Sequence, residues 1–382
     1  MKRIYMDNGA TSFPKAPNVA EAVYKYITEN GCNVNRSSYE NAANAEDILL
    51  DTRYMLCNIF DFDKPSNVVF TSGITESLNC VIKGLLKKDD HCIISGFEHN
   101  SVMRPINSIG TKWTIAECDE YGNFNNIENL FEYNTKLVVM THSSNVFGNV
   151  LQLKKVGEIC KSKNIPFVID TAQTAGHINV SFKELNCDVL CFAGHKGLLA
   201  PQGIGGMIMI DEMTKLIPPL IEGGTGSVSH TIETPEFMPD KFEAGTMNIP
   251  AIYGLNTALK YIIETKIENI QSHEENMRKT FVEGIEKIDG FKVVQLKNSL
   301  HTPVVSITCD FMDIAELSYI LESQFGIETR CGLHCSPYAH KTMGTYPEGT
   351  LRFSFGFNTN LDDINAVLSA LYKIKSIKNT GV

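Results

Sequence analysis

Short apolar segments alternate with amphipathic segments between residues 65 and 210. The apolar segments predict buried strands at residues 67–73, 91–96, 111–118, 136–144, 166–170, 188–194 and 205–211. Between several of them, apolar residues recur with a helical period and predict helices at residues 74–87 and 153–164. This alternation indicates an α/β fold, with a parallel or mixed sheet covered by helices on both faces. In such folds the functional groups gather at the carboxyl ends of the strands.

The pattern changes after a loop-rich stretch at residues 218–250. Helices are predicted at residues 249–265, 268–287, 313–323 and 362–374, and strands at residues 291–296, 303–309 and 350–356. This order is typical of a smaller α+β domain at the C-terminal end. A chain of 382 residues also exceeds what one compact core usually organises. We therefore expect a large domain at residues 16–255 and a small domain at residues 256–382.

Composition and charge favour a protein that acts on a small-molecule substrate. The chain is 43% hydrophobic, has a formal net charge of -10, and contains no run rich in Lys and Arg. This charge disfavours binding to nucleic acid or to an anionic membrane. No stretch approaches the roughly 18 consecutive apolar residues that a membrane helix needs, and the first fifteen residues lack the apolar core of a signal peptide. We expect a cytoplasmic protein that does not bind membranes.

The chain contains eleven cysteines, which are scattered along it and often lie inside apolar segments. This distribution predicts reduced, buried thiols rather than disulfides. Cys331 and Cys335 are separated by three residues, but neither a second pair nor a histidine cluster accompanies them. We therefore expect no metal site.

Polar groups follow two of the predicted strands. Lys196 lies between glycines after the strand at 188–194, where burial would lower the pKa of its amine and allow a Schiff base. A surface lysine in a turn is the alternative. Asp170 could keep the ring nitrogen of a pyridine cofactor protonated, or it could cap a helix. Gln173 could bind the phenolic oxygen of such a ring, or lie on a solvated helix.

Further groups follow other strands. The backbone N–H groups of Gly73, Ile74 and Thr75, with the Thr75 hydroxyl, form a candidate anion site at a helix start, although a simple helix cap is the alternative. His99 could stack on a planar cofactor or cap a helix, and Asn145 could reach a phenolic oxygen. Together with the lysine and the aspartate, these groups point to pyridoxal 5′-phosphate, because one cofactor explains all of them.

The order of the motifs resembles that of a known family. The motifs are YMDNGATSFPK, TSGITESLN, EHNSV, SSNVFG, VIDTAQ, GHKGLLAPQGIG, FEAGTMN, TRCGLHCSP and LRFSFGFNTN. They resemble the cysteine desulfurase and selenocysteine lyase branch of the class V aminotransferase-fold enzymes, in the group with a short RxGxHC loop. The resemblance implies the fold type I of pyridoxal-phosphate-dependent transferases, with a mostly parallel seven-stranded sheet. It also implies that residues 1–15 pack near the active site.

The resemblance implies roles around the cofactor ring. Lys196 matches the lysine that holds the cofactor covalently, and Asp170 matches the partner of the pyridinium nitrogen. His99 matches the stacking histidine, which could also shuttle protons. Asn145 and Gln173 match residues around the phenolic oxygen.

Further matches concern the cofactor phosphate. Thr75 and His195 match phosphate ligands. Thr246 matches a threonine that reaches the phosphate of the neighbouring subunit, which implies a homodimer. The chain departs from the family at Ala193, where many relatives have a hydroxyl that binds the phosphate. This departure removes one expected ligand.

The remaining matches concern the substrate. Arg352 matches the arginine that binds the substrate α-carboxylate, a task that suits its planar fork of donors. Asn8 and Ala10 match a segment that lines the substrate pocket. Cys335 matches the catalytic cysteine, and Arg330 the arginine that opens the same motif.

The implied reaction converts L-cysteine to L-alanine and leaves a persulfide on Cys335. The thiolate is the reactive form, and Arg330 and His334 could lower the pKa of this thiol. A sulfur-acceptor protein is a possible partner. Selenocysteine lyase activity on L-selenocysteine is the main alternative. Another reaction of class V enzymes would give the cysteine no role, and a non-catalytic scaffold would not need the full set of site residues.

Overall fold

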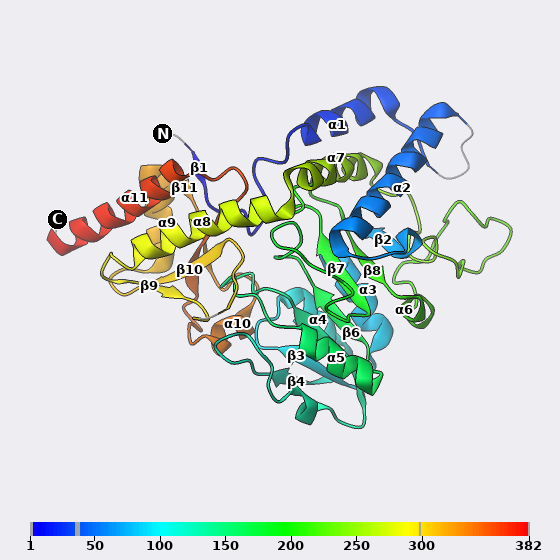
Figure 1. The fold of residues 1–382 in the computed structure, drawn as a ribbon, viewed down its shortest axis with the longest axis horizontal. Coiled ribbons are helices and arrows are strands. Elements are labelled where there is room, and N and C mark those ends of the chain that lie inside the picture. Colours follow the sequence, from blue (N-terminus) through cyan, green and yellow to red (C-terminus); the bar gives the residue numbers. More distant parts are fainter. Residues whose placement is uncertain (1–2, 35–38, 298, 381–382) are drawn as a thin grey trace.

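A seven-stranded sheet forms the centre of the larger part of the molecule (Figure 1). The computed structural model describes residues 3–34, 39–297 and 299–380. The strands are β2 (Val68–Thr71), β3 (His91–Ser95), β4 (Lys112–Ala116), β5 (Thr135–Thr141), β6 (Phe167–Asp170), β7 (Val189–Ala193) and β8 (Gly205–Met209). Their order is β2-β8-β7-β6-β5-β3-β4, and β8 runs antiparallel to both of its neighbours while the other pairs are parallel. The predicted α/β class with a mostly parallel seven-stranded sheet is confirmed.

Helices cover both faces of this sheet because each strand is apolar on both sides. Val69 packs into the cluster on one face, whereas its neighbour Phe70 packs into the cluster on the other. The first face is covered by α3 (Ile74–Leu85), α4 (Asn100–Ile109) and α6 (Asp211–Leu216). The second is covered by α2 (Glu40–Phe60), α5 (Lys154–Lys163) and α7 (Ile249–Thr265), with α1 (Val19–Lys25) against α7.

The parallel register brings the segments that follow several strands to one edge of the sheet. Thr141 at the end of β5 pairs with Asp170 at the end of β6, and Asp170 pairs in turn with Cys191 near the end of β7. The segments that carry Asn145, Asp170 and Lys196 therefore start side by side. The neighbouring β3 is parallel as well and leads to His99.

The smaller part of the molecule is built on an antiparallel four-stranded sheet of order β12-β13-β10-β9. These strands are β9 (Phe291–Val294), β10 (Val304–Cys309), β12 (Arg330–Gly332) and β13 (Thr350–Ser354). The helices of this part are α8 (Ile267–Ile285), α9 (Ile314–Phe325), α10 (Pro337–Thr342) and α11 (Leu361–Thr380). Apolar residues of α8, α9 and α11 form one cluster with this sheet, so this part has a core of its own.

The N-terminal segment connects the two parts. Strand β1 (Ile4–Tyr5) pairs in parallel with β11 (Ile327–Glu328), and both strands lie at the small part in Figure 1. Ser12 N then donates to His195 O over 3.0 Å, beside the turn that carries Lys196. The division at residue 255 stays a prediction. Residue 255 lies inside α7, and the apolar contacts change clusters within α8, between Ile270 and Met277.

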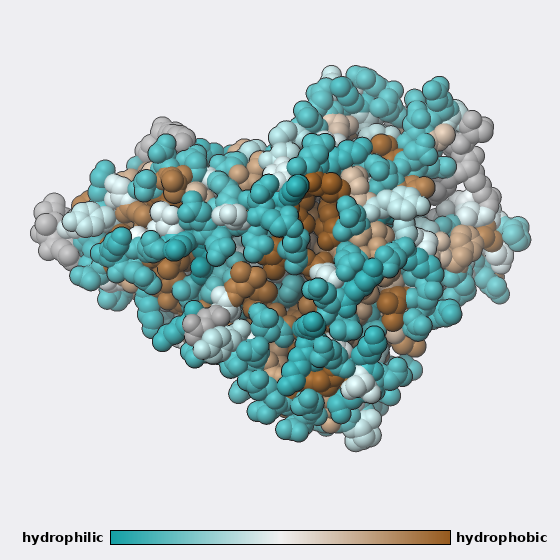
Figure 2. All heavy atoms as spheres, in the orientation of Figure 1, coloured by the Kyte–Doolittle hydropathy of each residue, from teal (hydrophilic) through white to brown (hydrophobic). Residues whose placement is uncertain are grey.

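The surface is mostly hydrophilic on the face that Figure 2 shows, with hydrophobic side chains gathered near its middle. No helix within the described residues is long and apolar enough to cross a membrane. All eleven cysteines are free thiols, six of them buried, which agrees with the predicted reduced state.

A buried ion pair closes the outer edge of the large sheet. Glu243 Oε2 lies 2.7 Å from Arg53 NH2 of α2, and both side chains are almost fully buried. Glu243 Oε1 also accepts a hydrogen bond from Phe70 N of the edge strand β2 at 2.7 Å, and Arg53 donates to Val68 O. This one carboxylate therefore satisfies both a buried cation and an unpaired edge N–H group.

We predict that Glu243→Ala lowers the free energy of unfolding by about 3–5 kcal/mol, because it leaves a buried guanidinium unpaired. Denaturant unfolding followed by circular dichroism measures this loss. The control is Glu283→Ala, which removes an exposed pair with Lys279 and should cost under about 1 kcal/mol. Similar small losses in both variants would contradict the role given to Glu243.

Candidate active site

A cavity of about 230 Å³ lies at the carboxyl edge of the large sheet and faces the small part of the molecule. It brings together most of the residues predicted from the sequence. These are Ala10, Ile74, Thr75, His99, Asn145, Asp170, Gln173, His195, Lys196, Arg330, Cys335 and Arg352. The residues come from both parts of the chain, so the cavity depends on how the two parts pack.

Lys196 lies in the turn after β7 and lines this cavity. Burial lowers the pKa of its amine to about 8, and Arg352 and Arg330 add to this effect while Asp170 opposes it. About a tenth of the amine is therefore uncharged at pH 7, far more than for a lysine with an ordinary pKa. An uncharged, buried amine is the form that condenses with an aldehyde.

Asp170 ends β6 and provides a buried carboxylate. Its Oδ1 accepts a hydrogen bond from Ala172 N at 2.8 Å. Burial raises the pKa of this carboxyl, and the positive charge of Lys196 works against that rise. A buried carboxylate of this kind is stabilised by a cationic or N–H partner, and a pyridinium nitrogen is such a group.

His99 is both a helix cap and a wall of the cavity. Its Nδ1 accepts a hydrogen bond from Ser101 N at 3.1 Å and lies 2.8 Å from Ser101 Oγ at the start of α4. Burial, followed by the positive charges of Lys196 and Arg330, lowers the pKa of His99 to about 4. The ring is therefore neutral at pH 7, and a neutral, fixed imidazole suits stacking on a planar ring.

The phosphate end of the expected cofactor has a matching site. Ile74 and Thr75 form the first turn of α3 and line the cavity, so free N–H groups and a hydroxyl lie at the positive end of a helix. His195 Nδ1 lies 3.0 Å from Thr11 Oγ1, and burial lowers the pKa of this histidine to about 4. Ala193 ends β7 without offering a hydroxyl. The residues present fit an anionic group, without the hydroxyl that the resemblance leads one to expect at position 193.

The N-terminal segment contributes to the cavity with its backbone more than with its side chains. Gln173 Nε2 donates to Gly9 O over 3.0 Å, and Gly9 and Ala10 line the cavity. Asn8 does not line it. The Asn8 side chain instead donates to Ser354 O at 3.1 Å and accepts from Phe13 N at 3.2 Å, so it holds the turn of this segment.

Arg352 of β13 is a buried cation, 1% exposed. Its NH2 donates to Asp7 Oδ1 over 2.6 Å and its NH1 to Asn145 O over 2.9 Å. Its Nε has no hydrogen-bond partner among the described residues, and Arg352 lines the cavity, so the guanidinium retains donor capacity for an acceptor such as a carboxylate. Sequence reasoning missed Asp7. The signal was present, since a buried guanidinium needs an anion and Asp7 stands beside Asn8 in the same motif.

Cys335 lies exposed at the edge of the cavity, on a strained segment. His334 and Cys335 have φ values of 48° and 60°, a left-handed conformation that costs non-glycine residues roughly 1–2 kcal/mol each. Arg330 NH2 lies 3.9 Å from Cys335 Sγ. A cation therefore faces the sulfur of Cys335.

The role expected of His334 is wrong. Burial, followed by the charge of Arg352, lowers the pKa of His334 to about 2, so the ring carries no charge at neutral pH. Its Nε2 lies 3.1 Å from Thr350 O, and its ring stacks on that of His340 with centroids 5.9 Å apart. The ring therefore faces the small part, and Arg330 is the cation beside the thiol.

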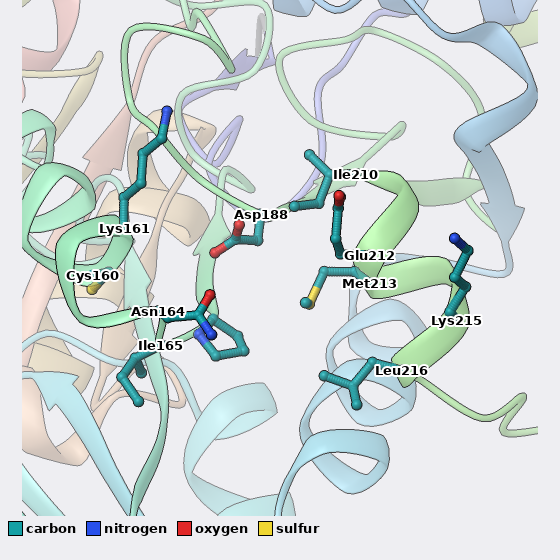
Figure 3. Close-up of a pocket in the computed structure, with 11 residues that line it drawn as sticks. Cys160, Lys161, Asn164, Ile165, Asp188, Ile210, Glu212, Met213, Lys215 and Leu216 are labelled. Atoms are coloured by element: carbon teal, nitrogen blue, oxygen red, sulfur yellow. The ribbon is translucent and has the colours of Figure 1, made fainter.

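Thr246 lies outside the cavity of its own chain. It is exposed and lines a separate pocket of about 340 Å³ with Ser72 and Glu76, behind the turn that starts α3. A larger cavity of about 540 Å³ lies elsewhere (Figure 3). It is lined by Asp188 and Pro166, which precede β7 and β6, so it lies at the opposite edge of the sheet from Lys196.

Comparisons with known proteins agree with this geometry. The sequence model of the aminotransferase class-V family matches residues 4–367. A probable cysteine desulfurase of Pyrococcus abyssi is 31% identical, over 99% of this chain and 96% of that protein. A probable cysteine desulfurase of Borreliella burgdorferi is 30% identical, over 97% and 91%.

A solved structure is similar as well. The apo cysteine desulfurase of Thermococcus onnurineus superposes with a TM-score of 0.89 at 30% identity, covering 98% of this chain and 95% of that one. The family match and the relatives thus agree along nearly the whole length. The chain belongs to the class-V aminotransferase family, within its cysteine desulfurases.

Proposed function

We propose that this protein is a pyridoxal-phosphate-dependent cysteine desulfurase that converts L-cysteine to L-alanine and transfers the sulfur to Cys335. The observation that carries the proposal is that Lys196, Asp170 and Cys335 line one cavity. The first two suit covalent binding and electronic support of the cofactor. The third is an accessible thiol beside a cation. Other reactions catalysed by enzymes of this fold would give this thiol no role.

Pyridoxal phosphate, when bound, supplies an aldehyde for the lysine and a ring that withdraws electrons from the substrate. The protein would hold it through Lys196 and Asp170 at one end and through the start of α3 at the other. His99 would lie against the ring, and Gln173 near its phenolic oxygen. The positive charges of Arg352 and Arg330 make the cavity favourable for an anionic cofactor and an anionic substrate.

The substrate carboxylate would bind to the unpaired donor of Arg352, which fixes the orientation of the bond between Cα and its hydrogen. Lys196, with its lowered pKa, would take the Cα proton as a general base. The Cys335 thiolate would then attack the substrate sulfur. A sulfur–sulfur bond forms as the carbon–sulfur bond breaks, and the electron pair stays with the substrate carbon, which takes up a proton and leaves as alanine.

We also propose that the working unit is a homodimer. Thr246 is exposed and lies outside the cavity of its own chain, so the phosphate contact expected of it would serve a neighbouring copy. The missing hydroxyl at Ala193 makes an additional ligand from a second copy more important. Eleven free thiols suit a reducing compartment, and we propose a cytoplasmic location on this ground.

A sulfur-acceptor protein would approach Cys335 from outside. A groove of about 370 Å³ adjoins the cavity and shares Thr75, His99 and Cys335 with it. Lys83 and Arg104 line this groove, which gives it a positive character. We propose that an acidic surface of the acceptor docks there, because opposite charges would guide it to the thiol.

We predict that the cofactor-free protein captures pyridoxal phosphate faster as pH rises through about 8. The reactive form is the neutral amine, which is scarce below the pKa of Lys196 and dominant above it. Borohydride reduction followed by peptide mass spectrometry measures the label. Lys196→Ala should carry no label. A label on another lysine, or a rate that does not change with pH, would refute the assignment.

We predict that Cys335→Ala lowers alanine formation from L-cysteine by at least about 1,000-fold, because it removes the nucleophile. Cleavage of L-selenocysteine, measured in parallel, shows whether release of selenium also needs the Cys335 thiol. The matched control is Cys331→Ala, whose side chain packs against the apolar cluster of the small part and which should retain activity. Normal desulfuration by the Cys335 variant would show that the nucleophile is misassigned.

A further inference from the structure

The segment around Cys335 is strained and must be held in place by its contacts. Left-handed φ values at two successive non-glycine residues, His334 and Cys335, persist only where the surroundings enforce them. Several backbone contacts do so. Cys335 O accepts a hydrogen bond from Asn100 N at 2.8 Å, and Ser336 N donates to Leu333 O over 2.8 Å.

The side chain of Asn145 holds this segment on both sides of the cysteine. Asn145 Nδ2 donates to His334 O over 2.8 Å, and Asn145 Oδ1 accepts from Ser336 Oγ at 2.6 Å. Ser336 is completely buried and Asn145 is 9% exposed. The serine hydroxyl therefore fixes the orientation of the amide, because it gives the amide oxygen a donor while the amide nitrogen meets a carbonyl oxygen.

The backbone of the same residue positions the substrate-binding cation. Asn145 O accepts from Arg352 NH1 at 2.9 Å. The guanidinium expected to bind the substrate carboxylate and the segment that carries the thiol are thus both attached to Asn145. The separation between these two groups determines whether the thiolate can reach the substrate sulfur.

We propose that Ser336 is a positioning residue for sulfur transfer, acting through Asn145 to keep Cys335 in reach of the substrate sulfur. This inference rests on the proposed desulfurase function. Ser336 Oγ bonds the side chain of Asn145, whereas Arg352 bonds the backbone oxygen of that residue, so loss of the hydroxyl should act mainly on the segment that carries the thiol. Ser336 contacts Asn145 and not the reacting atoms, so its effect is indirect.

The test compares the holoenzyme with Ser336→Ala, with Ser336→Thr, which keeps a hydroxyl, and with Ser323→Ala as a matched control. Ser323 Oγ donates to Tyr319 O on the exposed side of α9, and Ser323 is not among the residues that line the cavity. Ser336→Ala should lower kcat for L-cysteine about tenfold with little change in KM, the size expected for one lost buried hydrogen bond. Ser336→Thr should recover most of the loss, and Ser323→Ala should match the wild type.

Two further measurements separate positioning from general damage. Exchange of the Cα proton of L-alanine in deuterated water reports on Lys196 without any sulfur to transfer, and it should stay within about twofold of wild type in Ser336→Ala. Amide hydrogen exchange at Asn100, whose N–H binds Cys335 O, should become faster in that variant because the segment loosens.

Opposite results would overturn the inference. These are an unchanged kcat for Ser336→Ala, a parallel fall of kcat and Cα exchange, or unaltered amide exchange at Asn100. The amide exchange measurement needs no turnover. If the wild-type protein failed to form alanine from cysteine, the proposed function would fail, while amide exchange would still decide whether Ser336 holds the segment.

Discussion

The buried guanidinium of Arg352 is the contact on which the rest of the site depends. It joins three regions that are far apart in sequence, namely Asp7 of the N-terminal segment, Asn145 of the large part and its own strand β13. A buried cation without these partners would be strongly destabilising. The requirement to pair it therefore keeps the first residues of the chain between the two parts, where the backbone of Gly9 closes the cavity.

Burial, reinforced by positive charge concentrated in a small space, determines the electrostatics of the site. The chain as a whole carries a net charge of -10, yet Arg352, Arg330 and Lys196 all line one cavity. Burial of each group, reinforced by these positive charges, keeps His99 neutral and lowers the pKa of Lys196. The same charges attract a phosphate and a carboxylate. One arrangement thus prepares the amine for reaction and selects anionic ligands.

The sequence predicts well those features that depend on local patterns. The seven strands of the large sheet are apolar segments between turns, and Asp170 and Lys196 directly follow two of them, so position along the chain is enough to place them. Helix α2, with 21 residues, was not assigned, because its apolar residues lie among many polar ones. Strand β12 was missed because it has three residues, one of them glycine.

Features that depend on contacts between distant residues were not predictable. The pairing of Asp7 with Arg352 and that of Ser336 with Asn145 join residues more than 190 positions apart. The wrong expectation for His334 has the same origin. Its place next to Cys335 in the sequence suggested a nearby charge, but the left-handed backbone turns its ring toward His340.

The hydrogen bond from Asn100 N to Cys335 O bears on how sulfur can leave the enzyme. It attaches the backbone of the cysteine to the first residue of α4, next to His99, which lines the cavity. A large excursion of this segment would leave the first N–H group of that helix without this partner. A sulfur atom held on the cysteine can therefore travel only as far as rotation of one short side chain allows, and the recipient has to come to the mouth of the cavity to collect it.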